Sequence, residues 1–355
     1  MTPRGLVLSV AGLIGLLLAA TSVTAQTSRA DTAKSYLERG GSWLKKGELE
    51  RAISDFDLAI ATDRSLSAAW HNRGLARYRQ GDRAGALRDY NQAAQLTPRH
   101  VETLLNRGVV LLEQGDFSSA RRDFDAIIEI NPRHARAYLN RGIVFAQSGA
   151  AANALADFTQ AIKLERRLHE AWAARCGAQA QQGRLAAAHA DCEQALKLAH
   201  DNVVALVNRG NLRLVQGDLD GALVDLSRAI ELAPRVATIW NNRGRAWLLK
   251  DDYEHALEDL NRALELDPTP PEMWDNRARV WSSRGEFSRA LEDFDQALRL
   301  NPRFAAALAG RGVTYLRLGR SAEADADFAL CRAISGSLPP YAEAAWREAQ
   351  ERPRK

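Results

Sequence analysis

The chain has 355 residues, of which 46% are hydrophobic and 26% are charged, and its formal net charge is +4. A chain of this length and composition can bury a core of ordinary size. Its basic residues are scattered among almost as many acidic ones, which argues against a stripe that binds nucleic acid. We therefore expect no nucleic-acid partner.

The first 25 residues have the pattern of a secretory signal peptide. A short start with Arg4 precedes an uncharged apolar run from Gly5 to Ala20, and small residues stand before Gln26. We expect cleavage after residue 25, a short linker over residues 26–32, and an exported protein that is periplasmic or secreted. The alternative is that residues 5–25, which are long enough to span a bilayer, stay as a membrane anchor. A membrane is a partner only in that case.

Residues 33–338 consist of nine consecutive copies of a 34-residue unit, whose positions are numbered here from residue 33. Each copy is predicted to be two helices, A and B, joined by a turn. Position 20, in helix B, is alanine in every copy: Ala52, Ala86, Ala120, Ala154, Ala188, Ala222, Ala256, Ala290 and Ala324. Position 8, in helix A, is Gly, Ala or Cys throughout, which predicts close approach of the two helices.

Signals for helix ends recur at the same spacing. Position 15 is glycine in eight copies, because glycine readily takes the left-handed conformation that closes a helix, and Asp251 replaces it in the seventh copy. Position 32 is proline in five copies, where it ends helix B: Pro98, Pro132, Pro234, Pro268 and Pro302.

This period and these positions resemble the tetratricopeptide repeat. The resemblance implies an all-α fold, a right-handed α-solenoid of nine tandem helix hairpins over residues 33–338. One hairpin cannot bury its apolar face alone, so neighbouring hairpins must stack and the ends need covering. Residues 339–355 are predicted to form a capping helix and tail, with Tyr341 and Trp346 covering the last repeat.

A charged pair recurs in every copy, with arginine at position 7 and aspartate at position 23. In an antiparallel hairpin that turns at position 15, these two positions face each other. We therefore predict nine Arg–Asp ion pairs. The alternative is an arginine stripe that binds phosphate or acidic ligands.

Two of the three cysteines, Cys176 and Cys192, fall on facing helices of the fifth repeat. Because an exported protein folds where disulfides persist, we predict a bridge between them. The alternative is that each is a small buried side chain. Cys331 replaces a buried alanine and is interpreted as packing.

No constellation for catalysis or metal binding is evident. The seven histidines are spread over different repeats without metal-ligand spacing, and no phosphate-binding loop or nucleophile elbow occurs. We expect no enzyme activity, no metal and no cofactor.

Helix A lines the concave surface of tetratricopeptide repeats, so the resemblance implies ligand contacts there. Asparagine stands at position 6 in six copies: Asn72, Asn106, Asn140, Asn208, Asn242 and Asn276. This resembles the asparagine row with which some family members hold an extended peptide, since an amide both donates and accepts hydrogen bonds. Glu38, Ala174 and Gly310 interrupt the row. The alternative is that these asparagines bond to a neighbouring helix.

The same face carries apolar residues, among them Leu105 and Val207, and charged residues toward the C-terminus, among them Arg245 and Arg279. Such a groove suits a protein segment better than a small anion. The predicted function is a non-catalytic exported scaffold that mediates protein–protein interactions through its concave groove. The alternative is a periplasmic chaperone or carrier that holds peptides with low sequence preference.

Overall fold

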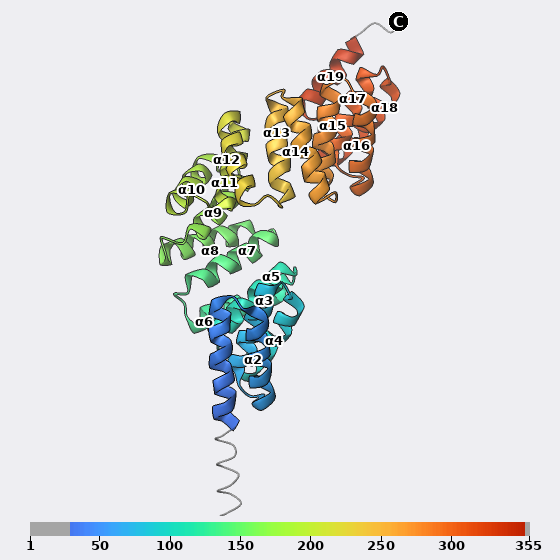
Figure 1. Ribbon diagram of the computed structural model, residues 1–355. Coiled ribbons are helices and arrows are strands. Elements are labelled where there is room, and N and C mark those ends of the chain that lie inside the picture. Colours follow the sequence, from blue (N-terminus) through green and yellow to red (C-terminus); the bar gives the residue numbers. More distant parts are fainter. Residues whose placement is uncertain (1–28, 352–355) are drawn as a thin grey trace, which may run out of the picture. The chain divides into compact units, whose positions relative to one another are not determined.

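A computed structural model describes residues 29–351 of the chain, and every regular element in this range is an α-helix. The predicted signal peptide lies outside the described residues. The chain divides into two compact units, residues 1–166 and 167–355 (Figure 1).

The N-terminal unit contains four helix hairpins. Its elements are a helix over residues 29–46, α2 (Leu49–Thr62), α3 (Ser67–Gln80), α4 (Arg83–Leu96), α5 (Val101–Glu113), α6 (Phe117–Ile130), α7 (Ala135–Gln147) and α8 (Ala151–Leu164).

The C-terminal unit contains five hairpins and a final helix. Its elements are α9 (His169–Gln181), α10 (Leu185–Leu198), α11 (Val203–Gln216), α12 (Leu219–Leu232), α13 (Ala237–Leu249), α14 (Tyr253–Leu266), α15 (Pro271–Ser283), α16 (Phe287–Leu300), α17 (Ala305–Arg317), α18 (Ser321–Ser335) and α19 (Pro340–Glu351). The predicted α-solenoid of nine hairpins followed by a C-terminal helix is thus confirmed.

Repeat positions 8, 20 and 24 form the interior of each hairpin. All nine alanines at position 20 are fully buried, and so are the phenylalanines at position 24. A Cβ atom added at Gly142 would lie 2.6 Å from Cε1 of Phe158, so position 8 has no room for a larger residue there. At the ends of the A helices, the glycines at position 15 have positive φ, and Asp251 takes the same conformation with φ of 56°.

The stacking of hairpins sets which helices face inward in each unit. Within each unit, each B helix except the last packs against the next A helix. A helices of neighbouring repeats also contact one another, for example α5 and α7 in the first unit and α13 and α15 in the second. No pair of B helices packs to a comparable extent within residues 29–351. Each stack therefore curves with its A helices on the inner side.

The nine predicted Arg–Asp ion pairs are all present. In each, Nε and Nη2 of the arginine donate to the two carboxylate oxygens of the aspartate, with distances of 2.5 to 2.9 Å. Several of these arginines use Nη1 to reach helix B of the preceding repeat, as Arg141 does with Asp125 at 2.7 Å. Because the guanidinium groups are engaged within the fold, the structure favours the structural role over an arginine stripe for ligands.

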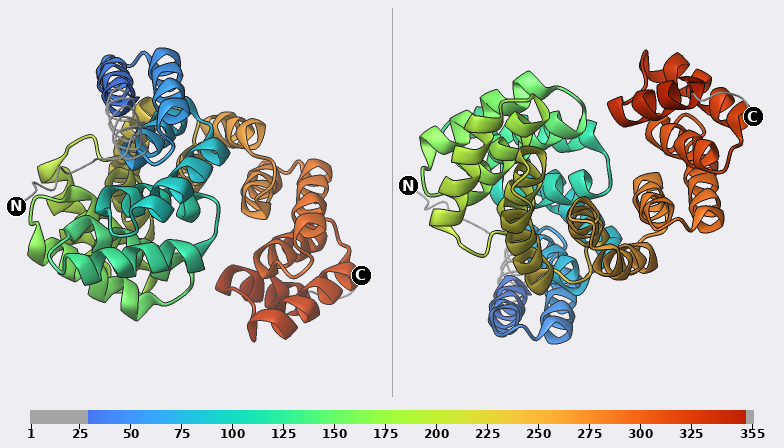
Figure 2. Two further views of the ribbon diagram at one scale, coloured as in Figure 1. Left: turned by 90° about the horizontal axis from the view of Figure 1, so that it is seen from below. Right: turned by 90° about the horizontal axis from the view of Figure 1, so that it is seen from above.

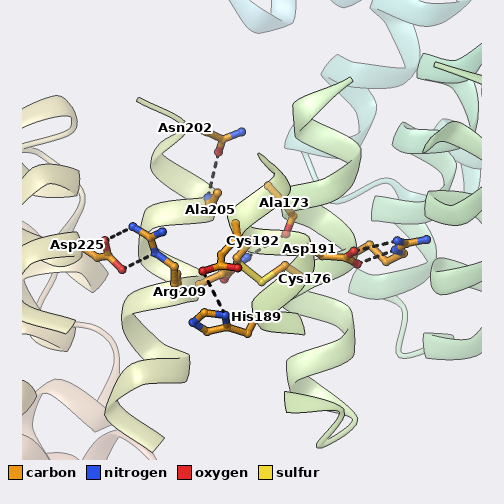
Figure 3. The surroundings of a disulfide bond; sticks show 12 residues. Ala173, Cys176, His189, Asp191, Cys192, Asn202, Ala205, Arg209 and Asp225 are labelled. Atoms are coloured by element: carbon orange, nitrogen blue, oxygen red, sulfur yellow. Dashed lines mark hydrogen bonds and ion pairs between the residues drawn. A yellow bond between two sulfur atoms is a disulfide. The ribbon is translucent and has the colours of Figure 1, made fainter. Parts of the chain in front are cut away.

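Cys176 of α9 and Cys192 of α10 form a disulfide at positions 8 and 24 of the fifth repeat (Figure 3). The Arg–Asp pairs of the fifth and sixth repeats flank the bond. Both cysteines are fully buried, as is the free Cys331 on α18. The bridge therefore occupies the place that glycine and phenylalanine fill in the preceding repeat.

Helix α19 packs on α17 at the C-terminal end of the second unit (Figure 2). Nε1 of Trp346 donates to Asp325 of α18, and the Arg332 guanidinium lies 4.3 Å from the Trp346 ring, so Trp346 covers the last hairpin as predicted. Tyr341 differs, because it reaches Arg279 of α15 in the eighth repeat. It can do so because α19 lies against an A helix, on the inner side of the stack.

No helix among the described residues is long and apolar enough to cross a membrane.

Candidate protein-binding cleft in the C-terminal unit

A cleft of about 530 Å³ opens between the A helices of the seventh and eighth repeats. Four residues singled out from the sequence line it: Asn242 and Arg245 of α13, and Asn276 and Arg279 of α15. The other lining residues are Asn241, Leu248, Leu249, Glu272, Asp275 and Phe304. The structure thus gathers part of the predicted row of polar residues into one concave site.

The helical period explains which side chains line the cleft. Glu272, Asp275 and Arg279 are spaced by three and four residues, so they share one face of α15. Pro271 at the first helical position begins α15, because its missing N–H needs no partner there. The charged face of α15 therefore starts at its first turn, directly beside α13.

Two of the six position-6 asparagines hydrogen-bond to the preceding repeat. Asn208 donates from Nδ2 to the backbone oxygen of Ala173 at 3.1 Å, and Asn276 donates from Nδ2 to Oδ1 of Asn241 at 2.9 Å. Both acceptors are position-5 residues. Both amides join adjacent A helices. Asn208 bonds to the backbone of a neighbouring helix, as the alternative interpretation expected, whereas Asn276 bonds to a side chain. The side chain of Asn242 makes no hydrogen bond within residues 29–351 and stays available to a ligand.

An ion pair between Asp275 and Arg279 lies at the base of the cleft. Asp275 is only 5% exposed, and its Oδ2 accepts from Nε of Arg279 at 2.8 Å. Its Oδ1 is buried and has no hydrogen-bond partner in the described part of the chain. Burial raises the pKa of Asp275, and the charge of Arg279 opposes this shift only in part.

Arg279 connects the cleft to α19. Its Nη2 donates to the backbone oxygen of Ala306 at 3.0 Å and to the Tyr341 hydroxyl at 2.9 Å, and its guanidinium lies 5.1 Å from the Tyr341 ring. Burial disfavours its charge, but Asp275 raises the pKa of Arg279 overall, so it stays cationic. Arg279 and Tyr341 also line a second cavity of about 300 Å³ with Arg317.

Apolar side chains are exposed on α13, which lines the cleft, and on α11, the A helix of the preceding repeat. Val204 and Val215 of α11 are 56% and 64% exposed, and Leu249 of α13 is 50% exposed. Val207, the apolar residue predicted to bind a partner, is half-buried and packs against the core that helices α9 to α13 share. Exposed apolar groups next to convergent polar groups are typical of a protein-binding surface.

The remaining predicted site residues lie in the N-terminal unit. Asn72 is on α3, Leu105 and Asn106 are on α5, and Asn140 is on α7, all of them half-buried. The cleft described above includes none of them. Conversely, Asn241, Glu272 and Leu248 line the cleft but were missed in the sequence. They stand at positions 5, 2 and 12 of helix A, and that face of the helix is the signal that could have identified them.

No group of three or more metal-ligating side chains occurs among residues 29–351. The polar groups of the cleft are carboxamides, carboxylates and guanidinium groups. This arrangement can form hydrogen bonds and ion pairs with a polypeptide segment.

Comparison with known proteins agrees with the observed fold. Two family models described as tetratricopeptide repeat match the chain, one at residues 71–127, 105–169 and 207–271, the other at residues 243–310. Together they span more than half of the sequence. No curated protein matches the chain significantly.

Solved structures with the same architecture include the hetero-tetramer Cut9-Hcn1 of APC/C. The similarity has a TM-score of 0.65 at 15% identity and covers 90% of this chain and 76% of that one. PilF of Pseudomonas aeruginosa matches with a TM-score of 0.50 at 20% identity, covering 58% of this chain and 94% of that one. At these identities the likeness shows the fold alone. The family models, the 34-residue period and the stacked hairpins together show that the chain belongs to the tetratricopeptide repeat family.

Proposed function

We propose that this protein is a non-catalytic exported scaffold that binds a segment of another protein on the inner side of its C-terminal unit. The observation that carries the proposal is the cleft of about 530 Å³ between α13 and α15, which the exposed Leu249 lines. Val215 of the preceding A helix, α11, is also exposed. A cleft of this size holds a few residues of a polypeptide.

The chemistry of the cleft supports a polypeptide ligand. The carboxamide of Asn242 can donate and accept at once, which suits a peptide bond of any sequence. Valine and leucine side chains that are exposed in the free protein would bury apolar surface on binding, which supplies most of the driving force for association. Charged groups on both walls would set the register of the segment.

Export is supported by the N-terminal pattern of residues 1–25 and by the Cys176–Cys192 disulfide, since such bonds persist in oxidising compartments. N-terminal sequencing of the protein from its native host tests this part. A mature chain that starts near Gln26 in the periplasmic or secreted fraction is the expected result. A full-length chain in the cytoplasm would overturn the proposal of export.

Affinity purification of the tagged full-length protein tests the binding role. We expect one stoichiometric partner, lost when Val215 and Leu249 are both replaced by Asp. Val224→Asp is the matched control, because Val224 is 68% exposed but lies on the B helix α12. A partner that stays bound to the double variant would place the interaction elsewhere.

A second candidate function is a carrier that holds many peptides with low sequence preference. The free amide of Asn242 favours it, because it can bond to the main chain of any segment. In the same purification, many unrelated clients in place of one stoichiometric partner would favour the carrier over the scaffold.

A further inference from the structure

We propose that Glu272 and Asp275 together form a receptor for one basic side chain, lysine or arginine, of the bound segment. This inference rests on the proposed function, since it names the chemistry that the cleft would recognise in its partner. It assigns the acidic face of α15 the role of selecting that partner.

Both carboxylates are placed to meet a ligand. They are three residues apart on the same face of α15 and both line the cleft. Glu272 is exposed, and its carboxylate makes no ion pair within residues 29–351. Asp275 is buried, with Oδ2 bonded to Arg279 and Oδ1 without a partner. A buried acceptor left without a donor destabilises the folded state, so the fold retains Asp275 at a cost in stability.

The missing donor has a structural cause. At two other places in the stack, a position-6 asparagine donates to the position-5 residue of the preceding repeat, as Asn276 does to Asn241. The position-6 residue that follows Asp275 is Gly310, which has no side chain to donate. A Cβ atom added there would lie 3.6 Å from Oδ1 of Asp275, so a side chain at this position would lie beside the unpartnered oxygen.

The packing of Phe294 explains why residue 310 is glycine. That Cβ atom would also lie 2.5 Å from Cε1 of Phe294. In most repeats the position-24 side chain packs against a glycine at position 8, but the eighth repeat has Ala278 there. The extra methyl group takes the space of the ring, and Phe294 lies against Gly310 instead. The acceptor of Asp275 is therefore open because of a specific change in this repeat.

Two features favour a cation over a neutral donor. First, this chain already pairs one buried carboxylate with two cations: Asp225 accepts from Arg209 and also from Arg213 at 2.7 Å. Asp275 holds only Arg279, whose Nη2 is taken by Ala306 and Tyr341. Second, Glu272 adds a negative charge that no cation of the described chain neutralises.

Arg245 defines the other wall of the cleft. It is exposed and makes no ion pair within the described residues. A basic side chain of the segment would therefore turn toward α15 and away from α13. This charge asymmetry would orient the segment between the two helices.

Selection of displayed random dodecapeptides on the full-length protein tests the inference. The wild type should enrich peptides with Lys or Arg at a constant spacing from an apolar residue. Replacing that basic residue by norleucine in a synthetic peptide should weaken binding about tenfold to a hundredfold, as expected for loss of a charged hydrogen bond.

Two variants locate the effect. Asp275→Asn keeps an acceptor for Arg279 but turns the free oxygen into an N–H donor, so it should weaken the basic peptide by a similar factor. Glu272→Lys should reverse the preference toward acidic residues, whereas Glu258→Lys on the B helix α14, an exposed matched control, should change nothing. In Asp275→Asn, the norleucine change should have little further effect, because coupled groups are not additive.

The outcomes separate the two proposals. If the wild type enriches no peptide, the binding role fails. If peptides are enriched but carry no basic residue, or carry Asn or Gln in its place, the binding role stands and the receptor for a basic side chain is overturned. Equal binding by wild type, Asp275→Asn and Glu272→Lys would overturn it as well. Melting curves of each variant, followed by circular dichroism, show whether it is folded.

Discussion

Two buried aspartates of the C-terminal unit show how hairpin interiors differ from the inner cleft. Asp225, in the hairpin of the sixth repeat, is 2% exposed, and its two oxygens accept three hydrogen bonds from Arg209 and Arg213. Asp275, at the cleft, is 5% exposed and accepts one from Arg279. The two carboxylates are almost equally buried, so burial does not distinguish the structural carboxylate from the one proposed to bind a ligand. The number of hydrogen bonds that each accepts distinguishes them.

Removal of the Asp225 carboxylate should destabilise the protein strongly. Asp225→Ala leaves Arg209 and Arg213 half-buried without their carboxylate, and we expect the free energy of unfolding to fall by about 3 to 5 kcal/mol. Urea unfolding followed by circular dichroism measures it. Arg209→Leu combined with Asp225→Leu should lose less, because it removes both members of the pair. A single variant that melts like the wild type would contradict the structural role.

The disulfide tests the hairpin interior in another way. Cys176 and Cys192 close a loop of 16 residues, and removal of such a loop constraint costs about 3 kcal/mol in the chain-entropy model. We expect the free energy of unfolding of the Cys176→Ala, Cys192→Ala variant to be lower by that amount, so that the variant unfolds at a lower urea concentration. In reductant, the stability of the wild type should approach that of the variant. Cys331→Ala is the control that leaves the bridge intact. Equal stability with and without reductant would mean that packing alone holds this hairpin.

Substitution of Asp275, whose Oδ1 has no hydrogen-bond partner in the described residues, should raise the stability of the protein and not lower it. Burial raises its pKa, so between its unfolded and folded pKa values the native state binds more protons than the unfolded state. The contribution of Asp275 to stability therefore falls as pH rises through that window. Relative to the wild type, Asp275→Asn should gain stability as the pH rises through this window, and the difference between the two proteins should stay constant above it.

Urea unfolding of both proteins over a range of pH measures this difference in stability. The contributions of the other titrating groups largely cancel, because both proteins contain them. Glu272 and Arg279 are the charged groups whose influence on Asp275 does not cancel fully. A wild type that stays more stable than Asp275→Asn at neutral pH would mean that the carboxylate is satisfied after all.

The hairpins could be predicted from the sequence, and the cleft only in part, for a physical reason. Contacts within a hairpin follow from the repeat period, so Arg209 and Asp225 could be paired by counting from the turn. Contacts between repeats depend on the offset of one hairpin against the next, which the period does not reveal. The bond from Asn276 to Asn241, and the reach of Tyr341 to Arg279, arise from that offset. The division between α8 and α9 likewise has no counterpart in the repeat pattern.

A change at Asp251 should alter the free energy of unfolding only slightly. Among residues 29–351 it is the only residue other than glycine with positive φ, and it lines the cavity that contains Arg279 and Tyr341. Asp251→Gly removes the strain of the left-handed conformation but also the hydrogen bond from Tyr253 to Oδ1. We expect a net gain of roughly 0.5 kcal/mol in the free energy of unfolding, from thermal or urea unfolding.

The matched change, Gly217→Asp at the end of α11, imposes the same strain without a tyrosine partner, so it should lose roughly 1 kcal/mol. If Asp251→Gly is instead less stable than the wild type, the Tyr253 bond outweighs the strain, and Asp251 belongs with the satisfied carboxylates. If it is more stable and also binds the selected basic peptides a few-fold less tightly, Asp251 belongs with Glu272 and Asp275. It would then be a third acidic group that binds the basic segment, on the same side of the stack, and like Asp275 it would be kept at a cost in stability.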